Sequence, residues 1–290
     1  MKRFLINIAA FCFLVAVTLA SFYWLYIHFT LPREKNTVYV WGDSQMYQDL
    51  DLQYLNKNSP HQFRSAALSG AGIYDFVVFS RLVPENSNVV IQISHTVVLR
   101  RKTVDRNYSA VNFDALAQLK KNNYSITELV EVMKNNVVPH KIFDSKNNLF
   151  PVADTICLAQ PLSLFQTVYA ERPSYFSDKE NLYLEGINML LKKKCKIIAL
   201  TFPKYPLLNE IEQKSPFYND LLAFDAHIGG LFKNKDSIII KAQGNIFYDL
   251  THFNARGAQQ LTTEIVTHLK FDNSPTIINV KPASENTPTN

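Results

Sequence analysis

The alternation of short apolar runs with helical patterns is the feature that most limits the folds open to this chain. Five runs rich in β-branched residues are typical of buried strands. They occupy residues 37–41, 63–69, 88–94, 196–202 and 237–242. Helical patterns follow the runs, at residues 47–56, 74–82, 178–193, 218–232 and 255–269. Because parallel strands need long crossover connections, this order predicts an α/β fold with a central five-stranded parallel sheet covered on both faces.

Residues with useful chemistry follow four of the five predicted strands. In an open parallel sheet the carboxyl ends of the strands meet at one edge, and binding and catalytic groups gather there. The residues at these ends are Ser44 after the first strand, Gly70 and Gly72 after the second, Ser94 and His95 after the third, and Asp249 and His252 after the fifth. We therefore expect all the candidate chemistry on one rim of the sheet.

Ser44, His252 and Asp249 have the types and order needed for nucleophilic catalysis. A serine hydroxyl is a weak nucleophile at neutral pH, so an imidazole has to take its proton during attack. An aspartate three residues before the histidine can reach the second ring nitrogen and fix the tautomer. A Gly-Asp-Ser turn and an Asp-x-x-His pair each occur by chance. Together at two strand ends, they predict a nucleophile, a base and an orienting carboxylate.

Three short motifs resemble a known family. The motifs are GDS at 42–44, SGAG at 69–72 and DLTH at 249–252, and they are similar to the first, second and fifth sequence blocks of the SGNH (GDSL-type) hydrolase superfamily. The resemblance covers roughly residues 38–269. It implies a flavodoxin-like three-layer sandwich, Ser44 as nucleophile and Asp249 with His252 as its partners. It also implies an oxyanion hole that includes the backbone N–H groups of Ser44 and Gly70, or of Gly72 in place of Gly70.

The third block departs from the family pattern. Relatives usually carry a glycine and an asparagine there, and the asparagine amide completes the oxyanion hole. This chain reads QISHTVV at 92–98, so Ser94, His95 or Thr96 would have to donate instead. Removing one oxyanion donor typically lowers turnover by about 100- to 1,000-fold.

The first thirty residues predict a membrane anchor. Residues 4–31 contain no acidic residue, lysine or arginine, and a helix of this length at ~1.5 Å per residue spans a hydrocarbon core of ~30 Å. A cleaved signal peptide ending near Ala20 is the alternative, but the apolar run continues beyond it through residues 22–26. We expect a single-pass protein of the bacterial cytoplasmic membrane. An outward, periplasmic or extracellular, catalytic domain rests mainly on the family resemblance, because the flanking charges are nearly balanced.

The remainder of the chain is expected to be one hydrolase-like domain at 31–271, followed by a disordered tail at 272–290. Within the domain, residues 100–176 break the alternation and carry polar helical pieces at 113–121 and 127–134. A connection this long is usually a lid or a binding loop.

Composition and spacing bear on cofactors and partners. A net charge of +5 with scattered lysines argues against nucleic-acid binding, and no histidine has metal-ligand spacing with another histidine or a cysteine. No cofactor is expected. Cys157 and Cys195 lie outside the anchor and could form a disulfide in an external domain or remain two buried thiols.

The resemblance and the anchor together imply a serine acyl esterase or O-acyltransferase that acts on acyl or acetyl groups of a cell-envelope polysaccharide. A membrane acyltransferase could be its partner. The competing hypothesis is a catalytically inactive polysaccharide-binding or accessory subunit, which the missing third-block asparagine favours. A weaker third hypothesis is an envelope scaffold that works through residues 100–176.

Overall fold

The protein was analysed as a computed structural model, which describes residues 2–30, 36–99, 120–121, 125–127, 129–130, 143–157, 159–241 and 245–283. The chain divides into two compact units, Met1–Arg33 and Glu34–Asn290. The predicted helical pieces at 113–121 and 127–134 lie largely outside the described residues.

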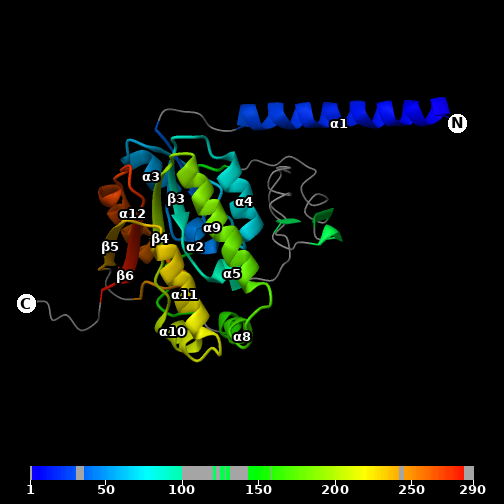
Figure 1. Ribbon diagram of the computed structural model, residues 1–290. Helices are drawn as coiled ribbons and strands as arrows, with labels where there is room; N and C mark the ends of the chain where they lie inside the picture. The colour runs from blue at the N-terminus through cyan, green and yellow to red at the C-terminus, as the bar shows by residue number, and fades with distance from the viewer. Residues whose placement is uncertain are drawn as a thin grey trace, which may run out of the picture. The chain divides into compact units, whose positions relative to one another are not determined.

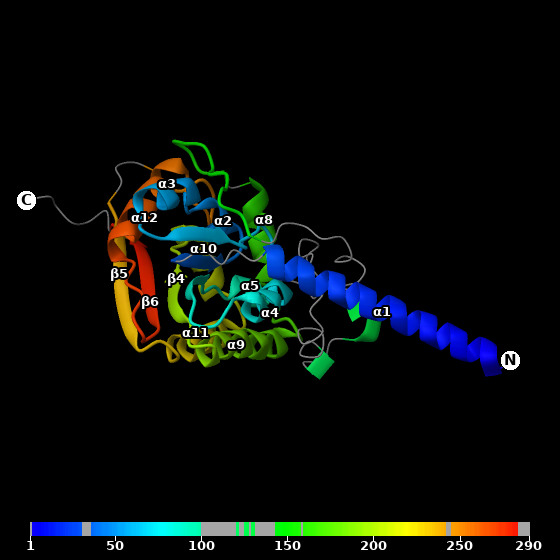
Figure 2. The ribbon, with the colours of Figure 1, turned by 90° about the horizontal axis from the view of Figure 1, so that it is seen from above.

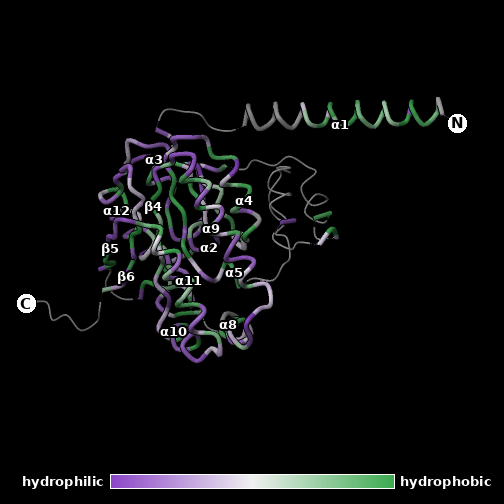
Figure 3. The backbone as a smooth tube through the Cα atoms, in the orientation of Figure 1, coloured by the Kyte–Doolittle hydropathy of each residue, from purple (hydrophilic) through white to green (hydrophobic). Residues whose placement is uncertain are grey.

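The first unit is a single apolar helix, α1 (Lys2–Thr30) (Figure 1). Its Phe4–Ser21 segment is long and apolar enough to cross a membrane, and hydrophobic residues recur along it (Figure 3). A signal sequence near the N-terminus would pass the same test of length and composition, so both interpretations of this segment agree with the helix.

The second unit is built on a parallel sheet, which confirms the predicted α/β class. The sheet has six strands rather than the predicted five, in the order β2-β1-β3-β4-β6-β5. The strands are β1 (Thr37–Trp41), β2 (Gln62–Ser65), β3 (Asn88–Gln92), β4 (Lys196–Thr201), β5 (Asn234–Ile240) and β6 (Thr276–Pro282). A flavodoxin-like layout is compatible with this sheet.

The sixth strand lies where a disordered tail was expected, so the prediction for residues 272–290 is wrong over 276–282. β6 pairs in parallel with β4 and with β5. Ile277, Ile278 and Val280 are buried, and Thr201 of β4 donates a side-chain hydrogen bond to Asn279 at 3.0 Å. The polar residues around these apolar positions hid a strand that is stabilised by neighbours distant in sequence.

Helices cover both faces of the sheet, as the alternation predicts. Figures 1 and 2 place α3 (Leu52–Asn58) and α12 (Ala255–His268) over one face, and α4 (Ile73–Leu82), α9 (Phe176–Lys192) and α11 (Tyr218–Gly229) over the other. The shorter helices are α2 (Ser44–Gln48), α5 (Thr96–Leu99), α8 (Ala159–Val168) and α10 (Pro206–Gln213).

The helix predicted at 47–56 is in fact split between α2 and α3. Asp49 is the C-cap of α2. Asp51 is the N-cap of α3, where its carboxylate accepts the Tyr54 N–H at 2.9 Å. Aspartate side chains compete for backbone donors and so favour caps over helix interiors.

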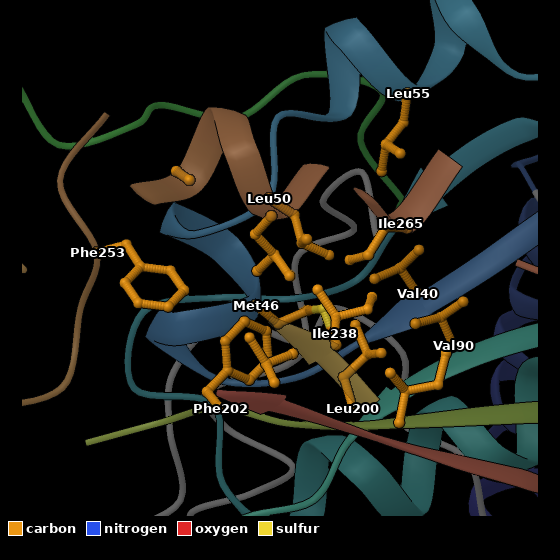
Figure 4. Packing of buried hydrophobic residues seen from close by; sticks show 14 of the residues in the cluster. Val40, Met46, Leu50, Leu55, Val90, Leu200, Phe202, Ile238, Phe253 and Ile265 are labelled. Carbon is orange, nitrogen blue, oxygen red and sulfur yellow. The ribbon is translucent and has the colours of Figure 1, made fainter. Parts of the chain in front are cut away.

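The hydrophobic core beneath α3 and α12 packs the strands against the helices on this face of the sheet (Figure 4). The strands contribute Val40, Val90, Leu200 and Ile238, and the helices and their connections contribute Met46, Leu50, Leu55 and Ile265. Each of these side chains is at most 2% exposed, so replacing one of the large ones with alanine would cost about 2–5 kcal/mol of stability.

Gly42 is required by close packing at the end of β1. A Cβ atom there would lie 2.3 Å from the Met46 Cβ and 2.6 Å from the Gln92 Oε1. We expect Gly42→Ala to lower the free energy of unfolding by about 1–3 kcal/mol because the core has to shift to admit the methyl group.

Thermal unfolding of the detergent-solubilised chain, followed by circular dichroism, measures this effect. Gly229→Ala is the matched control, since a Cβ there meets nothing within 4 Å. Equal melting temperatures for the two variants would contradict the packing argument.

The two cysteines of this unit are not bonded to each other. Cys157 is exposed and Cys195 is buried, and both are free. Cys195 precedes β4 at the amino-terminal edge of the sheet, whereas the Cys157 N–H donates to the Tyr248 carbonyl beyond the carboxyl end of β5 at 2.9 Å. The disulfide alternative is therefore wrong, and the buried-thiol alternative holds for Cys195 alone.

Candidate active site

Ser44 is the first residue of α2 and follows a tightly held turn at the end of β1. The Asp43 carboxylate caps α2 by accepting the Gln45 N–H at 3.0 Å. The Asp43 N–H in turn donates to the Gln92 Oε1 of β3 at 2.9 Å. These bonds tie the turn to two elements, so Ser44 is presented from a fixed backbone.

Asp249 and His252 lie on one loop between β5 and α12. The Asp249 Oδ1 accepts the backbone N–H groups of Thr251 and His252, each at 2.8 Å, so the carboxylate organises its own loop. Asn254 then caps α12, as an N-cap asparagine should, by accepting the N–H groups of Arg256 and Gly257 at 3.0 and 3.2 Å.

The structure brings these three predicted residues together in a hydrogen-bonded relay. The His252 Nδ1 lies 2.8 Å from the Asp249 Oδ2, and its Nε2 lies 2.8 Å from the Ser44 Oγ. With the ring proton on Nδ1, facing the carboxylate, Nε2 is free to accept the serine proton. Residues 208 positions apart thus form the arrangement that activates a serine.

The electrostatics of Asp249 suit this role. Burial raises its pKa, but the hydrogen bond and the charge of His252 and the N–H donors of Thr251 and His252 outweigh burial and hold the pKa below its ordinary value. Asp249 is therefore an anion at neutral pH, and it can stabilise an imidazolium on His252.

Two buried glutamines, which sequence reasoning missed, join the serine turn to the histidine loop. The Gln92 Nε2 donates to the Gln45 Oε1 at 2.9 Å, and the Gln45 Nε2 donates to the Thr251 carbonyl at 2.7 Å. This chain of amides connects β3, α2 and the 249–252 loop. The signal in the sequence was a polar Gln92 directly after the apolar residues 89–91 of β3.

Asp49 is a second support that the sequence did not indicate. It is fully buried, and its Oδ1 accepts the Phe253 N–H at 3.0 Å, directly after His252. Its Oδ2 finds no hydrogen-bond partner among the described residues. Burial raises the pKa of Asp49 well above its ordinary value, against the opposing effect of the Phe253 N–H.

The five expected oxyanion contributors do not all gather at Ser44. The Gly72 N–H already donates to the Asp75 Oδ2 at 2.5 Å. The His95 Nε2 lies 3.1 Å from the Glu212 Oε1, in a different cluster. The Gly72 N–H and the His95 Nε2 therefore have partners other than an oxyanion in this structure, and the oxyanion role expected of these two residues stays a prediction.

The other oxyanion assignments stay predictions. Gly70 occupies the turn after β2 with a positive φ of 88°, a conformation that favours glycine. The Ser94 and Thr96 hydroxyls lie 2.7 Å apart, and Thr96 donates to the Asp43 Oδ2 at 3.4 Å. Of the three residues considered as substitute donors, Ser94 and Thr96 therefore lie next to the serine turn.

Part of the predicted 100–176 insertion lies against the histidine loop. Phe150 stacks on Tyr248 with ring centroids 4.1 Å apart, and its centroid is 5.2 Å from that of His252. The Ala153 carbonyl accepts the side-chain amides of Asn245 and Asn254, each at 3.1 Å. An aromatic wall beside the imidazole keeps part of the site out of water, which strengthens its electrostatic interactions.

No known protein-family model matches the chain, and no curated protein matches it significantly.

Proposed function

We propose that this protein is a membrane-anchored serine acyl esterase or O-acyltransferase with an SGNH-like active site. The observation that carries the proposal is the position of His252, whose two ring nitrogens both lie 2.8 Å from their partners, Ser44 and Asp249. A purely structural histidine has no need of a serine hydroxyl at one nitrogen and a buried carboxylate at the other.

The mechanism follows from this geometry. As the Ser44 Oγ attacks an ester carbonyl, the His252 Nε2 takes its proton, and Asp249 stabilises the imidazolium. Collapse of the tetrahedral intermediate breaks the ester bond, and the imidazolium returns the proton to the leaving alcohol. A water molecule or a sugar hydroxyl, deprotonated by His252, then attacks the acyl-serine and regenerates the hydroxyl.

The substrate class rests on the anchor and on the family resemblance. A helix able to span the membrane would keep the domain beside envelope polymers, so acyl or acetyl groups of a cell-envelope polysaccharide are the proposed substrate. We place the domain on the outer side of a bacterial cytoplasmic membrane. A membrane acyltransferase would serve as partner if the reaction is transfer rather than hydrolysis.

Covalent labelling tests the proposal. The full-length chain in nanodiscs is incubated with a fluorophosphonate and analysed by intact-protein and peptide mass spectrometry. We expect one adduct, on Ser44, and none in Ser44→Ala or His252→Ala, because attack on phosphorus also needs the hydroxyl and its base. Ser237→Ala, which changes an exposed serine on β5, is the matched control and should label fully.

The absent third-block asparagine favours a second candidate, a catalytically inactive polysaccharide-binding subunit. Its signature would be a folded protein that binds glycan but gives no adduct on Ser44. Labelling of Ser44 would exclude this candidate.

A further inference from the structure

A second group of buried polar side chains lies at the carboxyl ends of β3 and β4. At its centre the Glu212 Oε1 accepts a bond from the Lys204 Nζ at 2.6 Å and a bond from the Tyr169 hydroxyl. The His95 Nε2 lies 3.1 Å from the same oxygen and 2.9 Å from the Lys204 Nζ. The relay at Ser44 uses none of these four residues.

Glu212 is an anion at neutral pH. Burial raises the pKa of Glu212, but His95 and Lys204 outweigh it and lower the pKa to about 2. A buried ion pair costs desolvation and often adds no net stability, so its presence calls for another explanation.

That explanation is suggested by the cavity beside the group. His95, Lys204 and Glu212 form one wall of an open cleft with a volume of about 1420 Å³. The other walls come from α10, α11, residues 154–156, residues 245–247 and residues 280–283 at the end of β6. The cleft lies at the carboxyl ends of the parallel strands, where such sheets bind ligands.

The charged groups in the cleft suit a ligand rich in hydroxyl groups. Lys204 and Lys281 are outnumbered by Asp154, Glu212 and Asp225, so a carboxylate or phosphate ligand would meet more negative than positive charge. A hydroxyl both donates and accepts, so it can pair with an ammonium and a carboxylate at once.

Unused hydrogen-bonding capacity is present on both sides of this wall. The Lys204 ammonium has three N–H donors, of which one bonds the Glu212 Oε1 at 2.6 Å, while the His95 Nε2 lies 2.9 Å from the Nζ. The Asp225 side chain is 52% exposed, and its Oδ1 lies 3.6 Å from the His95 Nδ1, too far for a good hydrogen bond.

Two aromatic residues give the cleft an apolar surface beside its charged groups. Tyr205 and Phe247 both line the cleft, with ring centroids 5.7 Å apart in an edge-to-face arrangement. The C–H face of a sugar ring packs well on such surfaces, since the aromatic face carries partial negative charge.

A residue of the cleft wall is hydrogen-bonded to a loop of the candidate active site. The Tyr205 N–H donates to the Leu250 carbonyl at 2.9 Å, within the loop that carries Asp249 and His252. Phe247 lines the cleft two residues before Asp249. A chain bound here would therefore run beside the loop that positions the base.

We propose that this cleft, lined by His95, Lys204, Tyr205, Glu212, Asp225 and Phe247, binds an uncharged stretch of oligosaccharide whose acyl group is handled at Ser44. The binding role rests on the cleft itself, and its link to acyl chemistry rests on the proposed function.

Calorimetric titration of full-length Ser44→Ala protein in nanodiscs tests the cleft without turnover. The probes are three tetrasaccharides: neutral N-acetylglucosamine, its cationic de-N-acetylated form and anionic galacturonic acid. We expect the neutral probe to bind best. Added to Ser44→Ala, Asp225→Asn and Tyr205→Ala should each weaken its affinity roughly tenfold, the effect of losing one charged hydrogen bond or one aromatic contact.

Glu210→Ala is the matched control, because Glu210 is exposed on α10 next to the cleft-lining Asn209 but does not line the cleft. Circular dichroism checks that each variant is folded. Unchanged affinity in both cleft variants, preference for the anionic probe, or no binding of any probe would overturn the proposal. If Ser44 is labelled but no glycan binds, the esterase proposal stands and the proposal for the cleft is refuted. If glycan binds in the cleft but Ser44 is not labelled, the proposal for the cleft stands and the esterase proposal is refuted.

Discussion

Replacing His252 with alanine is expected to lower the turnover of p-nitrophenyl acetate by about 10⁶-fold, to the level of Ser44→Ala. The reason is the single hydrogen bond between the His252 Nε2 and the Ser44 Oγ, because without the imidazole no described group receives the serine proton. Kinetics on the full-length chain in detergent measure the effect through kcat/KM.

The double variant gives the sharper test. Residues that act as one unit are strongly non-additive, so Ser44→Ala with His252→Ala should be no slower than either single variant. His227→Ala is the control, since His227 is an exposed residue of α11 paired only with Glu180 among the described residues. Turnover that survives His252→Ala within tenfold would refute the relay.

Asp249→Asn is expected to lower turnover by about 10⁴-fold while leaving the serine in place. An asparagine amide can donate to the His252 Nδ1, which would put the ring proton on Nε2, where it cannot accept from Ser44. The imidazolium would also lose the anion 2.8 Å away. Asp272→Asn, at an exposed position after α12, makes the same charge change and should not alter turnover.

The same variant has a stability signature with a defined sign. The folded-state pKa of Asp249 is depressed below its unfolded value. Its stabilisation is therefore complete above the ordinary carboxyl pKa of about 4 and is lost as the pH falls through the lower, folded value. Melting temperatures of wild type and Asp249→Asn should differ at pH 7 and converge in acid. A gap that stayed constant to low pH would show that Asp249 is not ionised in the fold.

The third-block departure has a local structural counterpart. Where the family would supply an asparagine amide, this chain places the Ser94 and Thr96 hydroxyls beside Asp43, while His95 joins the Glu212 cluster. Of the three candidate substitute donors, His95 thus belongs to another cluster.

Local patterns in the sequence predicted much of the fold. β1 spans residues 37–41 as its apolar run indicated, and α4, α9, α11 and α12 lie close to the predicted helices. Ser44, Asp249 and His252 could also be selected from the sequence, because strand ends and a three-residue spacing are short-range properties.

What only the tertiary structure decided are the contacts between distant segments. β6 forms a strand because it pairs with both β4 and β5 and lies between them in the sheet. Gln45 joins the serine turn to the histidine loop because its Nε2 donates to the Thr251 carbonyl, 206 residues away, at 2.7 Å. His95 follows the same strand as Ser94, yet its ring is held by Glu212 and Lys204. Periodicity reports which face of an element is apolar, whereas the partner of a buried polar group depends on the order of strands and on the elements packed over them.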